Sequence, residues 1–205
     1  MGNFKHWFKD SWLNRHVISA IKHPERFIFL KKYPFWKTRN VWTGKFAGYD
    51  VSMYEWIPDG WRKAFGEQLT QDIVKAFKED KIPKRKWCKN LQWQDIKEKD
   101  GTLRFYAVTT EKIQDVFEKY ECLSMAYCIN CGEPSKYITG YWVEYLCEGC
   151  FDQRGYSDKT KAKKQCRLSK KYLPVYTRYE NGVAHQYTPK DLWGIDLLKM
   201  WGLKK

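Results

Sequence analysis

Four cysteines in the second half of the chain form two pairs, each with two residues between its members. The pairs are Cys128-Ile-Asn-Cys131 and Cys147-Glu-Gly-Cys150, and fifteen residues separate them. Two thiolates from each tight turn supply four sulfur ligands, the number that a tetrahedral structural zinc ion takes. The sequence therefore predicts one structural Zn²⁺ bound by Cys128, Cys131, Cys147 and Cys150.

Catalytic zinc is disfavoured by the residues around these pairs. A catalytic site keeps one coordination position open and usually has a histidine or carboxylate ligand. The sequence has no histidine between His23 and His185, and it lacks the H-x-E motif that precedes the cysteine pair of zinc deaminases. Redox chemistry of the cysteine pairs is a weaker alternative.

The other three cysteines, Cys88, Cys122 and Cys166, are isolated in the sequence. Disulfides are not expected, because the count of seven is odd and residues 1–12 lack the apolar run of a secretory signal. We predict that these three cysteines are small, partly buried hydrophobic side chains. A role of Cys166 as a fifth or alternative metal ligand is the second, weaker interpretation. No apolar run approaches the roughly 18 residues of a membrane span, so a cytoplasmic protein without membrane contact is expected.

The net charge of +14 is concentrated at the two ends of the chain. Residues 1–45 hold ten Lys and Arg against two Asp and Glu, and residues 151–205 hold thirteen against five. Residues 46–150 hold fifteen against seventeen. Basic ends favour an acidic partner, either a nucleic acid or an acidic protein surface. The candidate partner-binding residues are Lys31, Lys32, Lys37, Arg39, Lys161, Lys163, Lys164 and Arg167.

The segment between the outer cysteines is acidic. It contains Glu133, Glu144 and Glu148, with Lys136 as its single basic residue. Zinc modules that read DNA are usually basic on their binding face. We therefore expect the zinc to fold the protein and the basic ends to contact the partner.

Hydrophobic periodicity and turn residues predict an α+β fold. In it, a β-hairpin and helices surround a four-cysteine zinc ribbon, followed by a C-terminal hairpin-helix extension. Helices are expected at residues 11–23, 24–30, 59–79, 111–125 and 189–200. Strands are expected at residues 38–42, 49–54, 91–98, 102–108, 137–146, 176–179 and 183–187. The predicted regions are a basic, aromatic-rich region at 1–57, a core with the zinc segment 128–150 at 58–152, and a basic linker, hairpin and helix at 153–205.

Two aspartates raise the alternative of a metal-dependent nuclease. Pro58-Asp59 and Asp95-Ile96-Lys97 partly match the PD…(D/E)xK pattern of such enzymes. A whole predicted helix separates the two halves, and Asp59 is better explained as the N-cap of that helix. The apolar residues of the helix recur at every fourth position: Trp61, Phe65, Leu69, Ile73 and Phe77. Catalysis is therefore not expected.

Residues 54–152 also resemble a group of small phage and prophage proteins. Those proteins share the pattern Q-[IV]-K-E-K-x-G-x-L-R-[FW]-Y, a helix, then C-x-x-C-G and C-x-x-C. The matching segment here is Trp93-Gln-Asp-Ile-Lys-Glu-Lys-Asp-Gly-Thr-Leu-Arg-Phe-Tyr106, followed by the two cysteine pairs. The chain departs from the pattern at Asp95, which is inserted after Gln94, so the register of the hairpin stays open.

The resemblance implies a phage accessory protein, a class that includes inhibitors of host defence. In class and composition the chain is also similar to zinc-containing anti-CRISPR inhibitors of an RNA-guided DNA nuclease. The expected function is a non-enzymatic inhibitor that binds and blocks a host protein. Direct nucleic-acid binding is the alternative, because the basic segments 31–39, where Lys and Arg are interleaved with aromatic residues, and 159–171 could contact phosphates and stack on bases. A steep loss of affinity with salt would distinguish it.

Overall fold

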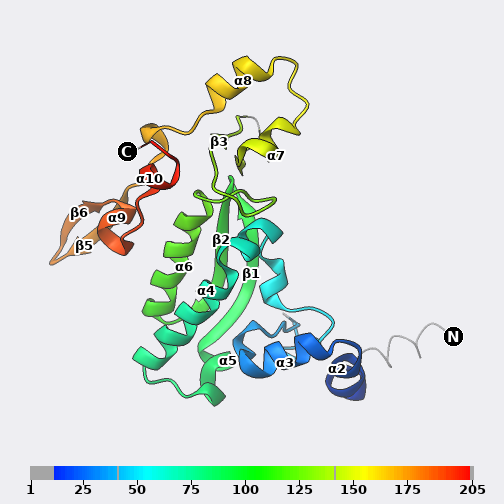
Figure 1. The fold of residues 1–205 in the computed structure, drawn as a ribbon. Helices are drawn as coiled ribbons and strands as arrows, with labels where there is room; N and C mark the ends of the chain where they lie inside the picture. The colour runs from blue at the N-terminus through cyan, green and yellow to red at the C-terminus, as the bar shows by residue number, and fades with distance from the viewer. Residues whose placement is uncertain (1–11, 41, 141, 204–205) are drawn as a thin grey trace.

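The computed structural model describes residues 12–40, 42–140 and 142–203 (Figure 1). These residues form helices and three small antiparallel hairpin sheets, consistent with an α+β fold. The α-helices are α2 (Ser19–Lys22), α3 (Pro24–Lys32), α4 (Asp59–Glu79), α5 (Trp87–Asn90), α6 (Glu111–Ser124), α7 (Glu148–Asp152), α8 (Lys159–Cys166), α9 (Pro189–Trp193) and α10 (Leu197–Met200). The strands are β1 (Leu91–Lys99), β2 (Thr102–Thr109), β3 (Tyr137–Ile138), β4 (Tyr145–Leu146), β5 (Tyr176–Glu180) and β6 (Val183–Tyr187). No helix within these ranges has both the length and the apolar character needed to span a membrane.

The centre of the molecule consists of α4 and α6 packed with the hairpin β1–β2 (Figure 1). Along α4, the predicted apolar stripe is buried: Trp61, Phe65, Leu69, Ile73 and Phe77. Along α6, Ile113, Phe117 and Tyr120 are buried. Each such side chain contributes on the order of 1.5–3 kcal/mol on full burial, so the two stripes fix both helices. The predictions of these helices are confirmed.

Asp59 is not the N-cap of α4, and that prediction is wrong. The N-cap position is Pro58, which makes no side-chain capping hydrogen bond. Asp59 is the first helical residue and forms an ion pair with Arg62, one turn further on. A carboxylate in the first turn interacts favourably with the helix dipole, so the residue type marks the helix start even though it sits one position inside.

The hairpin β1–β2 forms as predicted, with antiparallel pairing from Leu91–Thr109 to Lys99–Thr102. Asp100 and Gly101 make the two-residue turn, and both have positive φ, at 52° and 77°. The register shifts between Trp93 and Asp95. This irregularity is a β-bulge, which leaves one residue of β1 without a partner in β2.

The segment before α4 forms short helices and turns in place of the predicted strands. The strands at 38–42 and 49–54 are wrong, because these ranges contribute only the isolated bridges Lys37–Ser52 and Arg39–Phe46 among the described residues. Short 3-10 helices lie at Pro34–Trp36, Met53–Trp56, Lys84–Lys86 and Lys170–Tyr172. A helix was predicted at 11–23, and its first residue, Ser11, lies outside the described residues. Within the described part of this range, the chain forms a π-helix at Asn14–Ile18 followed by α2.

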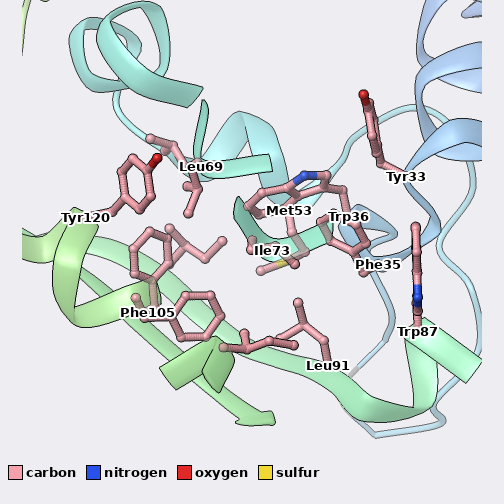
Figure 2. Packing of buried hydrophobic residues seen from close by; sticks show 14 of the residues in the cluster. Tyr33, Phe35, Trp36, Met53, Leu69, Ile73, Trp87, Leu91, Phe105 and Tyr120 are labelled. Atoms are coloured by element: carbon pink, nitrogen blue, oxygen red, sulfur yellow. The ribbon is translucent and has the colours of Figure 1, made fainter. Parts of the chain in front are cut away.

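Aromatic side chains of this segment enter the core beside α4 and α5. Figure 2 shows Tyr33, Phe35 and Trp36 with Trp87 in one packed cluster. The indole Nε1 of Trp36 donates a hydrogen bond to Thr70 Oγ1 at 3.1 Å. A buried indole needs such a partner for its N–H. The aromatic residues of this segment therefore pack in the core without forming a sheet.

The C-terminal residues build a second core against the end of α6. It contains Leu197, Leu198 and Trp201, and Trp201 Nε1 donates to the carbonyl of Met125 at 3.1 Å. The hairpin β5–β6 forms as predicted around Asn181-Gly182, both of which have positive φ. The predicted terminal helix is divided into α9 and α10, because Gly194 adopts a φ of 70°.

Candidate metal centre

The first cysteine pair lies in a tight turn just after α6. The backbone N–H of Cys128 donates to the carbonyl of Glu133 at 2.7 Å, and that of Gly132 donates to the carbonyl of Cys128 at 2.9 Å. Gly132 has a φ of 82°, in the region that favours glycine. The C-x-x-C-G segment thus closes on itself, which fixes Cys131 next to Cys128.

The second cysteine pair lies at the start of α7. Cys147 is the N-cap residue, and its Sγ accepts a hydrogen bond from the backbone N–H of Cys150 at 3.4 Å. Gly149 lies inside α7 and has no positive φ. The second pair therefore sits on a helical turn, unlike the first.

A two-stranded hairpin connects the two pairs. The single strand predicted at 137–146 is wrong, because the chain reverses between β3 and β4 and pairs Tyr137 with Leu146. The hydroxyl Oγ1 of Thr139 accepts the backbone N–H of Glu144 at 2.8 Å, which stabilises the reversal. The reversal brings Cys147 back beside the turn that holds Cys128.

The four thiols converge on one point. Their Sγ atoms all lie within 4.8 Å of one another, and those of Cys131 and Cys147 are 3.5 Å apart. Tetrahedral zinc with Zn–S bonds of about 2.3 Å requires sulfurs about 3.8 Å apart. Cys128 is buried and the other three are half-buried. Among the described residues this is the one group of three or more side chains that could hold a metal ion.

The environment of the thiols favours a bound cation. Burial raises the pKa of Cys128, but hydrogen bonds from backbone N–H groups, including those of Cys147 and Cys131, outweigh it and bring this pKa below its ordinary value. Burial and the adjacent thiols raise the pKa of Cys150. Burial likewise raises the pKa of Cys131. Four thiolates at this separation repel one another, so a divalent cation is needed to ionise them together.

The first turn of α4 packs directly against the first cysteine pair. The N–H of Gly60 donates to the carbonyl of Ile129 at 3.0 Å, and Trp61 Nε1 donates to the carbonyl of Tyr127 at 3.0 Å. A Cβ at Gly60 would lie 2.3 Å from the carbonyl oxygen of Cys128 and 2.4 Å from that of Ile129. The candidate metal centre is therefore attached to the central helix through close backbone contact, which no sequence pattern predicted.

Basic residues neutralise the acidic segment, which we call the cysteine module (residues 128–152). Glu148 forms ion pairs with Lys136 at 3.3 Å and Lys163 at 3.1 Å, and Lys163 also reaches Asp152 at 2.9 Å. These lysines, Lys163 first, hold the pKa of Glu148 below its usual range. Lys163, one of the candidate partner-binding residues, is thus engaged by the module.

The eight candidate basic residues fall into two groups at opposite ends of the molecule (Figure 1). One group belongs to α3 and the residues after it: Lys31, Lys32, Lys37 and Arg39. The other belongs to α8 and the residue after it: Lys161, Lys163, Lys164 and Arg167. Arg167 lies over the ring of Tyr137, 5.5 Å from its centroid. Lys163 and Arg167 therefore contact the cysteine module, whereas Lys161 and Lys164 are exposed.

The isolated cysteines lie outside the four-thiol group. Cys122 lies in α6 and is buried in the C-terminal core, and burial raises its pKa to about 12. Cys88 is half-buried and donates to the carbonyl of Pro34 at 3.0 Å. Cys166 is half-buried and packs near the cysteine module. These contacts fit the prediction of partly buried hydrophobic side chains.

The two aspartates of the nuclease alternative lie in separate ion pairs. Asp59 contacts Arg62, and Asp95 contacts Lys97 at 2.5 Å. Neither belongs to a group of metal-ligating side chains in the described part of the chain.

Comparison of the chain with protein-family models, with curated proteins and with solved structures found no match.

Proposed function

We propose that the four cysteines bind one structural Zn²⁺. All four positions of a tetrahedral site would be occupied by sulfur, which leaves none for a substrate or an activated water. The apolar cluster within the cysteine module is small, with Cys128, Tyr137, Leu146 and Phe151 as its buried members, so metal binding would supply much of the energy that folds the module. The arrangement of a turn, a hairpin and a helix start favours a treble-clef-like site over a ribbon.

Metal analysis of the purified protein tests this part of the proposal. We expect one zinc per chain after purification without added metal. A chain that folds stably with no metal, or that holds iron at full occupancy, would refute the assignment. A ratio of one cobalt per chain with a tetrahedral thiolate spectrum after exchange would support the four-sulfur geometry.

We further propose that the protein is a non-enzymatic inhibitor that binds a host defence protein and blocks it in the host cytoplasm. The candidate partner is an RNA-guided DNA nuclease, on the strength of the phage-protein resemblance. The observation that carries the proposal is a set of cations that share one concave site and have no carboxylate partner among the described residues: Lys37, Arg39, Arg85 and Lys89. Such charge steers a basic protein toward acidic surfaces and nucleic-acid channels.

A titration of DNA cleavage tests the inhibitor proposal. A guide-loaded nuclease is mixed with increasing amounts of the protein before target DNA is added, across a panel of nuclease types. A blocking inhibitor abolishes cleavage at molar equivalence with the nuclease, whereas an enzyme acts at far lower amounts. No inhibition across the panel contradicts the proposal of an RNA-guided nuclease as partner, and degradation of the guide or target contradicts the non-enzymatic role.

A further inference from the structure

A concave site of about 490 Å³ lies between the segment after α3 and the start of the β1–β2 hairpin. Four basic side chains line it, and no acidic residue does: Lys37, Arg39, Arg85 and Lys89. We call this site the cationic pocket. Its volume suits a group of nucleotide size. The helix α5, which contributes Cys88 and Lys89 to the lining, lies at the opposite end of the molecule from α7 of the cysteine module (Figure 1).

The four cations come from segments that are distant in the sequence. Lys37 and Arg39 follow the 3-10 helix Pro34–Trp36, whereas Arg85 and Lys89 lie one helical turn apart in the region of α5. The packing of Phe35 against Trp87, with ring centroids 5.8 Å apart, holds the two segments together. The aromatic core therefore fixes the positions from which these cations project.

Within the described residues, these cations have no carboxylate as an ion-pair partner. Lys37 is half-buried, and burial together with the charges of Lys31 and Arg39 lowers its pKa, although Cys88 opposes this. Concentrated like charges cost free energy in the unbound protein, so an anionic ligand would relieve a repulsion already present.

An exposed tryptophan lies between two pocket-lining residues in the sequence. Asn40 and Gly44 line the pocket, and Trp42, which lies between them in the chain, is 91% exposed. The side-chain Oδ1 of Asn40 accepts the backbone N–H groups of Trp42 at 3.0 Å and Thr43 at 2.9 Å. This turn holds the indole of Trp42 in solvent, where the side chain gains nothing from burial, and the residues on either side of the turn line the cationic pocket.

We propose that the cationic pocket binds single-stranded nucleic acid. Arg85 and Lys89, with Lys37 and Arg39, contact backbone phosphates, and the indole of Trp42 stacks on a base. Cations along a groove with an exposed aromatic side chain are what sequence-tolerant single-strand binding uses. An acidic peptide would contact the cations, but its carboxylates would offer no ring on which the indole of Trp42 could stack. The inference rests on the same four cations as the inhibitor proposal, but the tests differ: strand binding can be present without inhibition of a nuclease, and inhibition can be present without strand binding.

Fluorescence anisotropy with labelled 12-nucleotide single strands, one of DNA and one of RNA, tests the proposal. The pocket variant is Arg85→Ala/Lys89→Ala. The matched control is Lys84→Ala/Lys86→Ala, which removes the same charge from the same exposed segment outside the pocket. We expect the pocket variant to lose at least tenfold in affinity, with the salt slope reduced by about 1.4 for two lost contacts. The control should lose less than threefold.

Substitution of Trp42 tests the stacking contact. Trp42→Ala should weaken binding by about tenfold, and Trp42→Phe should recover most of the loss. Oligoglutamate, inorganic phosphate and a blunt duplex serve as competitors. Competition by oligoglutamate as strong as by the single strand, together with no effect of Trp42→Ala, would reassign the pocket to acidic proteins. Equal losses in the pocket and control variants, or no binding by the wild type at 50 mM salt, would overturn the proposal.

Cys88 provides a second readout that does not depend on affinity. Its half-buried thiol lines the pocket. A saturating single strand should slow alkylation of Cys88, measured by peptide mass spectrometry, and leave the rate at Cys166 unchanged. Unaltered Cys88 alkylation in a sample that binds the strand would place the nucleic acid elsewhere on the surface.

Discussion

Basic side chains surround both the cysteine module and the cationic pocket, but their electrostatic settings differ. Around the module, Lys163 contacts Glu148 and Asp152, and Arg154 contacts Glu144. Around the pocket, the four cations face one another across a hollow without a carboxylate among its lining residues. The first arrangement offsets charge within the fold, and the second leaves it for a ligand.

This difference changes what the net charge means. The two basic ends look equivalent in composition, yet part of the C-terminal excess neutralises an acidic metal-binding segment. Paired surface charges contribute little to partner attraction, whereas unpaired cations in a concave site focus the electrostatic field. The N-terminal side is therefore the stronger candidate for a binding surface, a distinction that a charge count could not make.

The largest expected effect comes from removing a metal ligand in the module. Cys147→Ser should abolish stoichiometric zinc binding and unfold the module, because structural zinc in small modules contributes about 10–16 kcal/mol. Metal analysis and thermal unfolding measure both results. Cys166→Ser is the control, since it packs beside the module outside the four-thiol group. An unchanged unfolding midpoint in Cys147→Ser would show that the module does not depend on a metal.

The next effect concerns the contact between the module and α4. A Cβ at Gly60 would overlap two carbonyl oxygens, so Gly60→Ala should destabilise the protein by about 3 kcal/mol while zinc stoichiometry stays at one. Gly149→Ala is the matched control, because nothing lies within 4 Å of a Cβ there. That substitution should be neutral or stabilise α7 by about 0.5–1 kcal/mol. Chemical denaturation measures both, and equal effects would mean that α4 and the module are not in tight contact.

A smaller effect tests the charge compensation itself. Lys163→Met leaves Glu148 and Asp152 without their shared partner and should lower the unfolding midpoint by a few degrees. The pKa of Glu148 is depressed, so its stabilisation is complete above the ordinary carboxyl pKa of about 4.3 and is lost as the pH falls through the folded-state value. The difference in unfolding midpoint between wild type and Lys163→Met should therefore disappear at acidic pH. Lys161→Met, on the exposed side of the same helix, should show no such difference at any pH.

Local patterns explain which parts were predictable from the sequence. The convergence of the four cysteines follows from C-x-x-C spacing, since each pair is fixed within a single turn. The α4 stripe follows from a four-residue repeat, and the β5–β6 turn follows from Asn181-Gly182. In each case the physical cause lies within a few residues of its effect.

The missed features depend on contacts between distant segments. Trp36 meets Thr70 and the ring of Trp93, and no local pattern near Trp36 indicates either contact. The aromatic segment before α4 was therefore predicted to form strands at 38–42 and 49–54, whereas it forms turns and short helices whose aromatic side chains pack in the core. The ion pair of Lys163 with Glu148 depends in the same way on the path of α8, and the cationic pocket depends on the approach of Arg85 to Arg39.

The smallest expected effect is a slight increase in the stability of the unbound protein when cations are removed from the cationic pocket. Arg85→Ala/Lys89→Ala removes two exposed cations from a site already crowded with Lys37 and Arg39, so it should stabilise the unbound protein slightly, by about 0.5 kcal/mol or less. Because the cause is repulsion between charges, the gain should be greatest at low ionic strength and vanish at 1 M salt, where the Debye length is about 3 Å. Thermal unfolding at three salt concentrations measures it. A destabilised variant would mean that these side chains pack or pair within the fold as Lys163 does, and the contrast between the two regions would then disappear.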